Sequence, residues 1–142
     1  MVKIVDPLGT PTPVYDRGGV TILTIAAGTA VDPCISAGAP EIPHPTSHTV
    51  AVVTTNNSHP TDSANKQPIL LPSDADVGDV VEVYHDPQAS GTFGLALFPP
   101  VGSSFGPGIP VNNGTGTNMF LTVDNVICRK IDATTWRLIK GV

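Results

Sequence analysis

The sequence predicts an all-β protein, an antiparallel β-sandwich or barrel-like domain that follows an extended Pro/Gly-rich N-terminal arm. Three observations lead to this prediction. The strand formers Val, Ile and Thr far outnumber good helix formers such as Leu, Lys, Glu and Met. The 142 residues include 15 prolines and 14 glycines, which interrupt regular structure. No segment shows the sustained apolar periodicity of an amphipathic helix.

The low charge of the chain narrows the fold class further. Charged residues make up 13% of the sequence, against about 25% in an average globular protein. A charge-driven disordered chain is therefore excluded, and the scarcity of helix formers excludes a helix bundle or a coiled coil. The length of 142 residues is sufficient for one domain with a core of its own.

The first 19 residues predict an extended arm rather than a helix. Pro7, Pro11 and Pro13 lack a backbone N–H, and Gly18-Gly19 ends the segment with flexible backbone. We expect residues 1–19 to form this arm and residues 20–142 to form a single β domain.

The first half of the domain predicts two strands separated by a long connection. Residues 20–26 (VTILTIA) and 49–54 (TVAVVT) have the composition of strands. Between them, the segment 27–47 contains four prolines, each of which disfavours the α region for the preceding residue and so excludes a long helix. Residues 55–67 are polar and predict a loop.

The second half predicts a more regular series of strands. The turn-rich segment 72–78 and the Gly/Pro/Asn-rich excursion 101–116 separate them. Tight links at 124–125 and 132–134 predict that the last three strands form an antiparallel meander. The predicted strands are 67–71, 79–84, 92–98, 118–123, 126–131 and 135–139.

Charge and hydropathy exclude several partners. The net charge is −5, and the seven basic residues are scattered, so we expect no nucleic-acid binding. No run approaches the roughly 20 apolar residues of a membrane span. Residues 1–7 lack the apolar stretch of a signal peptide, which predicts synthesis in the cytoplasm without secretion by that route. Cys34 and Cys128 are expected to be packed thiols rather than a disulfide.

One segment matches a catalytic pattern. Residues 102–106 (GSSFG) fit the G-x-S-x-G turn that exposes a nucleophilic serine, here Ser104, between a strand and a helix. Pro107, Gly108 and Pro110 follow immediately, so no helix can begin there. We therefore interpret the match as a plain Gly/Ser loop and expect no catalytic residues.

The histidines and acidic residues give no complete metal site. His44 and His48 have the spacing of a helical metal pair, but Pro43 and Pro45 exclude the helix that would align them. They are expected to be surface or loop histidines. The segment 74–79 resembles the start of a calcium loop but lacks the glycine and glutamate that complete it.

These acidic residues have a simpler role in the prediction. Asp74, Asp76 and Asp79 are expected to bond to nearby backbone N–H groups and to set up the strand over 79–84, although calcium binding remains an alternative. We predict no metal and no cofactor.

The block from Ile69 to Ile139 carries four motifs that are informative through their order and spacing. These are ILLPSDADVGDVVEVY over 69–84, LALFPPVG over 95–102, GIPVNN over 108–113 and ATTWRLI over 133–139. Together they resemble a module of tailed-bacteriophage virion proteins. That module has a leucine-proline step before G-D-x-V-x-V, a strand before P-P-x-G, a Gly/Asn/Ala-rich turn, and a closing T-x-W-x-(L/I) strand. The resemblance covers about half of the chain, and its shared elements form turns rather than a reacting centre.

The resemblance implies a capsid decoration (cement) protein. Such a protein is not an enzyme; it binds the outer surface of the major capsid shell as a homotrimer and stabilises the head. Its partners are the major capsid protein and its own copies, and its location is the virion. An alternative is a receptor-binding or fibre-head module, with ligand contacts on the loops 27–47 and 101–116. A small hydrolase that uses Ser104 is a third hypothesis.

The N-terminal arm is the candidate contact with the capsid or a neighbouring subunit, because it contains apolar residues but has no obvious core of its own. An edge strand packed back on its own domain is an equally good interpretation of these residues. The candidate contact residues are Val2, Ile4, Val5, Leu8, Val14 and Tyr15.

Overall fold

The computed structural model describes residues 2–5, 11–14, 19–30, 34–56, 66–88, 95–114, 120–122 and 125–140. These residues form ten β-strands and no helix, which confirms the all-β prediction. The strands are β1 (Val2–Val5), β2 (Pro11–Val14), β3 (Val20–Ala26), β4 (His48–Thr55), β5 (Gln67–Leu70), β6 (Val80–Pro87), β7 (Leu95–Phe98), β8 (Phe120–Thr122), β9 (Asn125–Lys130) and β10 (Trp136–Lys140).

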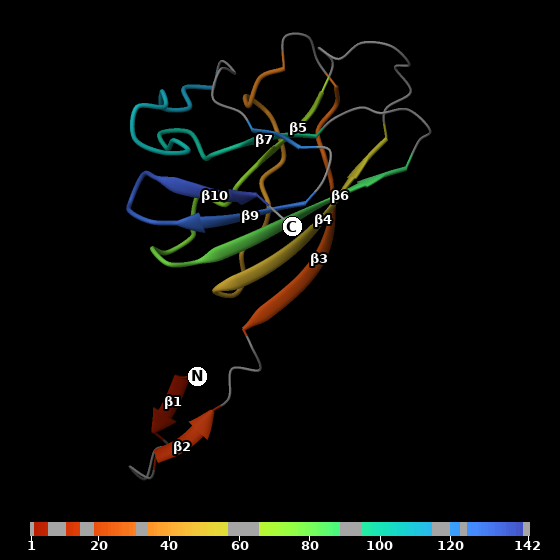
Figure 1. Ribbon diagram of the computed structural model, residues 1–142. Helices are drawn as coiled ribbons and strands as arrows, with labels where there is room; N and C mark the ends of the chain where they lie inside the picture. The colour runs from red at the N-terminus through yellow and green to blue at the C-terminus, as the bar shows by residue number, and fades with distance from the viewer. Residues whose placement is uncertain are drawn as a thin grey trace.

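The main sheet has five strands in the order β10-β9-β6-β4-β3 (Figure 1). β3, β4 and β6 run parallel, whereas β6 pairs antiparallel with β9 and β9 with β10. A smaller sheet has the order β5-β7-β8, with β5 and β7 parallel and β7 and β8 antiparallel. The main sheet ends in β10 and β3, so it is not a closed barrel.

The prediction of an antiparallel fold was therefore wrong in part, because both sheets are mixed. The predicted meander of the last three strands was wrong in part. β9 and β10 form the expected antiparallel hairpin in the main sheet, but β8 pairs with β7 in the small sheet. Parallel neighbours require a crossover of a dozen or more residues. The segments 27–47 and 56–79 are long enough to be such crossovers.

The crossovers build a second layer over the main sheet. The first crossover runs beside β5, where the Leu70 N–H donates to the Pro40 carbonyl and the Ile42 N–H donates to the Leu70 carbonyl, both at 2.9 Å. Glu41 and Leu70 also form a parallel β-bridge. The second crossover contains β5 itself, which pairs with β7. The two crossovers and β7 are thus joined by backbone hydrogen bonds.

The hydrophobic core joins residues of the main sheet with residues of this second layer. Alternate side chains of β4 and β6 are fully buried, as strand geometry requires. The main sheet contributes Ala51, Val53, Val81, Val83, Val126, Cys128 and Trp136 to the core cluster, and the second layer contributes Ile42, Ile69, Leu71, Leu95 and Leu97.

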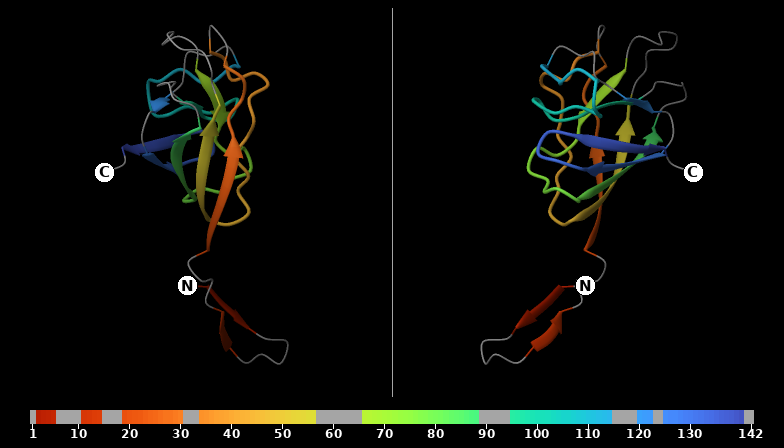
Figure 2. Two further views of the ribbon diagram at one scale, coloured as in Figure 1. Left: turned by 90° about the vertical axis from the view of Figure 1, so that its right-hand side faces the viewer. Right: turned by 60° about the vertical axis from the view of Figure 1, so that its left-hand side comes forward.

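The N-terminal strands form a separate antiparallel hairpin. Val2 pairs with Val14 and Val5 with Pro11, and the two strands make a sheet of their own. Figures 1 and 2 show this hairpin beyond the N-terminal end of β3, outside the body of the molecule.

A core truncation tests the two-layer arrangement. Leu97 in β7 is fully buried in the core cluster, so Leu97→Ala is expected to lower the free energy of unfolding by about 2–5 kcal/mol. Val77→Ala is the matched control, because Val77 is 61% exposed and its truncation should change stability by less than about 0.5 kcal/mol. Urea denaturation followed by tryptophan fluorescence measures both. Equal effects of the two substitutions would contradict this core.

Candidate functional site

Ser104 is a structural residue of the connection between β7 and β8. Its backbone accepts the Trp136 N–H and donates to the Thr134 carbonyl, both at 2.9 Å. Its side-chain Oγ donates to the Gly106 carbonyl at 3.3 Å, and the residue is only 8% exposed. No helix follows it in residues 105–114. The strand-turn-helix geometry of a nucleophilic serine is therefore missing here.

His44 is the centre of a buried polar clamp. Its Nε2 lies 2.9 Å from Asp79 Oδ2, and its Nδ1 lies 2.8 Å from Thr49 Oγ1. The side chain of His44 is 3% exposed, so the prediction of a loop histidine holds but that of a surface histidine was wrong. The clamp ties the first crossover to the start of β4 and to the residue just before β6.

The clamp has the order hydroxyl, imidazole, carboxylate that is also found in acyl-transfer triads. Thr49 has no solvent exposure, so no substrate can reach its hydroxyl. A reacting group also needs space around the attacking oxygen. The arrangement therefore fixes the chain and has no catalytic geometry.

In the turn before β6, the side chain of Asp79 bonds to a backbone N–H as predicted, whereas Asp76 takes part through its backbone. The Asp76 N–H donates to Asp79 Oδ2 at 2.8 Å, and the Asp79 N–H donates to the Asp76 carbonyl at 3.1 Å. Gly78 has φ of 98° in this turn, a conformation that glycine adopts without steric cost. Lys130 Nζ, largely buried, donates to the Ala75 carbonyl at 2.5 Å. These bonds attach the turn to the end of β9.

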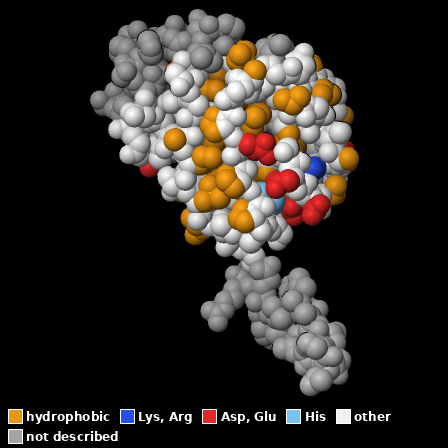
Figure 3. Space-filling model, turned by 180° about the vertical axis from the view of Figure 1, so that it is seen from behind, with side chains coloured by type: hydrophobic (Ala, Val, Ile, Leu, Met, Phe, Trp, Pro, Cys, Tyr) orange, Lys and Arg blue, Asp and Glu red, His pale blue; other side chains and the backbone are white. Residues whose placement is uncertain are grey.

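Acidic side chains gather beside a histidine on the face seen in Figure 3. Even so, no three His, Cys, Asp or Glu side chains of the described ranges come together in a group that could hold a metal ion. The described residues also contain no helix that is long and apolar enough to cross a membrane.

The two cysteines are free and buried, as predicted. Burial raises the pKa of both thiols, most strongly for Cys128, because a charged thiolate is poorly solvated there. Cys34 Sγ donates to the Lys66 carbonyl at 3.4 Å. Lys66 acts to lower the pKa of Cys34, but burial outweighs it, and neither cysteine has the solvent exposure of a reactive thiol.

The outer face of the main sheet carries a row of side chains at paired positions that is apolar except for the central Glu82. Ile22, Val50, Glu82, Ile127 and Ile139 follow one another across the five strands. Ile22 is 72% exposed and Ile139 is 54% exposed. An open apolar row of this kind is typical of a surface that contacts another protein. The next row contains Val20 and Val80 together with the polar His48, Arg129 and Arg137. We call the first five residues, with Val20 and Val80, the outer face.

A small polar cluster lies within the outer face. Glu82 Oε1 is 3.0 Å from His48 Nε2, and Glu82 Oε2 accepts the Tyr84 hydroxyl at 3.0 Å. This hydrogen bond and the charge of Glu82 raise the pKa of Tyr84. The cluster occupies both oxygens of the only acidic residue in the row, so the carboxylate is locked in one position.

A second exposed apolar group lies on the connection from β7 to β8. Val101 is 64% exposed, Val111 is 52% exposed and Ile109 is 43% exposed. Asn112, which the sequence did not single out, fixes this segment, because its Nδ2 donates to the Pro99 carbonyl at 2.7 Å and its Oδ1 accepts the Ser36 hydroxyl at 2.8 Å. An asparagine within the Gly/Pro/Asn-rich run 101–116 carries no sequence signal for this role.

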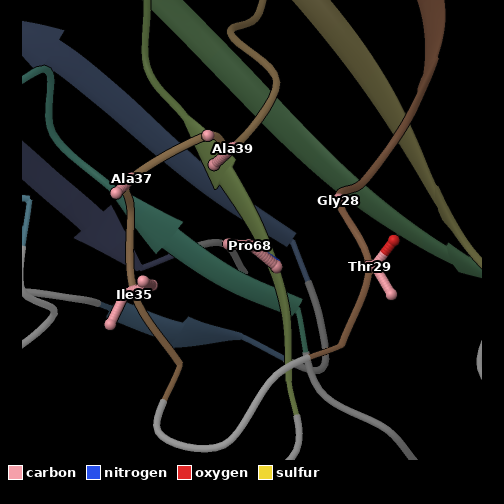
Figure 4. A pocket seen from close by; sticks show the side chains of 7 residues that line it. Gly28, Thr29, Ile35, Ala37, Ala39 and Pro68 are labelled. Carbon is pink, nitrogen blue, oxygen red and sulfur yellow. The ribbon is translucent and has the colours of Figure 1, made fainter.

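A shallow hollow of about 200 Å³ lies near the start of the first crossover (Figure 4). Its lining consists of small or apolar residues without a titratable group, namely Gly28, Thr29, Ile35, Ala37, Gly38, Ala39 and Pro68. Such a lining can hold a small neutral group but supplies no titratable acid or base.

The predicted contact residues of the arm are placed only in part. Val2, Ile4 and Val5 lie in β1, and Val14 lies in β2. Leu8 and Tyr15 lie outside the described residues.

Comparison with protein-family models, with curated proteins and with solved structures finds no match for this chain.

Removal of the clamp histidine tests its structural role. His44→Ala leaves the Asp79 carboxylate and the buried Thr49 hydroxyl without this partner, and we expect a loss of about 2–3 kcal/mol in the free energy of unfolding. The control is His48→Ala, because the His48–Glu82 pair is partly solvated and should contribute less than about 1 kcal/mol. Thermal and urea unfolding measure the stability of both variants. A larger loss of stability in His48→Ala than in His44→Ala would contradict the structural role of the clamp.

Proposed function

We propose that this protein is a capsid decoration protein of a tailed bacteriophage, which binds the outer surface of the major capsid shell as a homotrimer and stabilises the head. It has no enzymatic role in this proposal and is located in the virion. The motif order over residues 69–139 supports the proposal through its resemblance to virion modules. The two sheets then serve as the layers of a β-sandwich whose task is to present surfaces.

The observation that carries the proposal is the outer face. Ile22 and Ile139 expose more than half of their surface at opposite edges of the sheet, with Val50 and Ile127 between them. Exposed apolar side chains in one row indicate a contact with protein, because such a patch is costly in contact with water. The low share of charged residues, 13%, favours the same kind of contact.

The polar side chains support a structural role. His44, Asn112 and Lys130 are all buried and bonded to other parts of the chain. They hold crossovers and turns in place, which a scaffold requires. None of them lies in a hollow with a nucleophile, base and oxyanion donor arranged around a substrate.

A trimer explains how a modest surface can bind tightly. Three identical faces on one particle engage three equivalent points of a shell, and each contact raises the effective concentration of the next. Three-fold symmetry also matches the three-fold points of a capsid lattice. The N-terminal hairpin adds a contact to the capsid or to a neighbouring subunit.

Substitution in the outer face tests this function. Ile139→Asp places a charge in the proposed contact, and we expect binding to undecorated phage heads to weaken at least about tenfold. Val101→Asp is the matched control, because Val101 is similarly exposed but lies on the β7–β8 connection. Co-sedimentation with heads and electron microscopy measure occupancy. Failure of the unmodified protein to bind heads, or equal binding by Ile139→Asp, contradicts the proposal.

A receptor-binding or fibre-head module is the second candidate. The exposed Val101, Ile109 and Val111 favour it, since they project from a connection that Asn112 holds rigid. The hollow beside the first crossover adds a place for a small ligand group. In this case Val101→Asp, and not Ile139→Asp, should abolish binding of labelled protein to host cells. Strong cell binding without head binding would favour this alternative.

A further inference from the structure

β3 is an open edge of the main sheet. In the part of the chain that the structure describes, it pairs with β4 on one side and with no strand on the other. Its inward-facing side chains Thr21, Leu23 and Ile25 are only half-buried, whereas Ala51 and Val53 in β4 are fully buried. The sheet is thus incompletely covered at this edge.

The backbone groups that face the open edge can be assigned. The Gly19 carbonyl accepts the His48 N–H at 3.3 Å, and the Ala27 N–H donates to the Thr54 carbonyl at 2.9 Å. Because these groups alternate in direction along a strand, the odd-numbered residues of β3 turn toward β4. The even-numbered residues turn their N–H and C=O groups to the open edge, and these residues are Val20, Ile22, Thr24 and Ala26.

This edge lacks the features that normally protect an edge strand. Proteins block such edges with charged residues, prolines, bulges or very short strands. β3 has seven residues, VTILTIA, without a charge or a proline. β10, the other edge of the same sheet, carries Arg137 and Lys140. The unprotected edge is therefore β3, and it is suited to accept a further strand.

The β1–β2 hairpin is the complementary half of this arrangement. A two-stranded hairpin on its own is marginally stable in water, yet this one lies apart from the body of the molecule (Figure 2). Pro11 and Pro13 are in β2, opposite Val5 and Lys3 of β1. Proline is tolerated in a strand where an N–H would point away from the neighbouring strand. The outer edge of β2 thus lacks two donors, and β1 offers the edge that can pair.

We propose that β1 of one copy adds to the open edge of β3 in a second copy, so that the copies exchange N-terminal hairpins. The proposal deepens the homotrimer of the proposed function and rests on it. Strand addition satisfies the free backbone groups of both edges with one ladder of hydrogen bonds. It also provides the hairpin with the third strand that it needs for stability.

A second copy fits better than the same chain. If the hairpin folded back onto its own chain, β2 would be the strand next to β3, because consecutive strands usually become neighbours. The edge of β2 that would face β3 lacks the N–H groups of Pro11 and Pro13, so it would pair poorly with β3. In a ring of copies, each chain donates one hairpin and accepts one, and a ring of three closes without leaving a free hairpin or a free β3 edge.

Proline substitutions at the two edges test the exchange. Lys3→Pro and Ile22→Pro each remove one N–H that faces the proposed ladder and none that the β1–β2 or β3–β4 ladder uses. Light scattering of the purified protein is expected to give three chains, and either variant is expected to fall to one chain of 14.7 kDa. The controls Lys3→Ala and Ile22→Ala should keep the trimer. Lys3→Pro leaves the body untouched, so it stays informative even if Ile22→Pro lowers stability.

Cross-linking decides which chain supplies the hairpin. Single cysteines along β1 (Lys3→Cys, Ile4→Cys, Val5→Cys) are each mixed with a tagged Ile22→Cys protein and oxidised. A disulfide between tagged and untagged chains is expected, and Ile139→Cys on the β10 edge should give none. The native cysteines are buried and do not compete. Cross-links that form only within one chain carrying both cysteines overturn the exchange.

The same experiments separate this inference from the proposed function. A monomer in solution that binds heads through its hairpin refutes the exchange between copies and leaves the decoration role intact. A trimer that depends on Lys3 and Ile22 but ignores heads supports the exchange and removes the decoration role. Equal oligomerisation with and without residues 2–14 overturns the exchange.

Discussion

The parallel pairing of β3, β4 and β6 is the constraint on which the rest of the structure depends. Parallel neighbours cannot be joined by a tight turn, so the chain has to leave the sheet and return after each strand. Prolines exclude a helix from the first return, which instead runs extended beside β5. The returns therefore become the second layer, and residues such as Ile42 and Ile69 close the core from that side.

The strands themselves were predictable, but their pairing was not. Segments such as 20–26 and 135–139 are identified by β-branched residues between turn signals, and both coincide closely with β3 and β10. Strand direction within a sheet depends on contacts between distant segments and leaves little trace in short alternating runs. The tight link at 124–125 suggested that β8 pairs with β9. In the structure β8 pairs with β7, and Leu97 of β7 lies opposite Phe120 of β8. Local turn chemistry was outweighed there by burial of β7 between two neighbours.

The candidate site was predictable to a smaller extent. The composition of VTILTIA predicts a strand, but it does not single out Ile22 as a contact residue, and the exposure of Ile22 follows only from the fold. The burial of His44 has no sequence signal either, because its partner Asp79 is distant in sequence. The prolines on either side of His44 suggested a surface loop. In the structure, His44 instead links Thr49 to Asp79. Sequence patterns indicate local geometry. A clamp such as that of His44 forms only when segments that are distant in the sequence come together in the fold.

The central place of β6 has a consequence for how the chain is made. β6 lies between β4, which precedes it, and β9, which comes close to the C-terminus. Folding is slow when distant segments have to meet first. The main sheet cannot be completed until β9 and β10 have left the ribosome. During that interval an unprotected apolar strand such as β3 is open to wrong partners. Low temperature and slow synthesis should therefore raise the soluble yield of this protein.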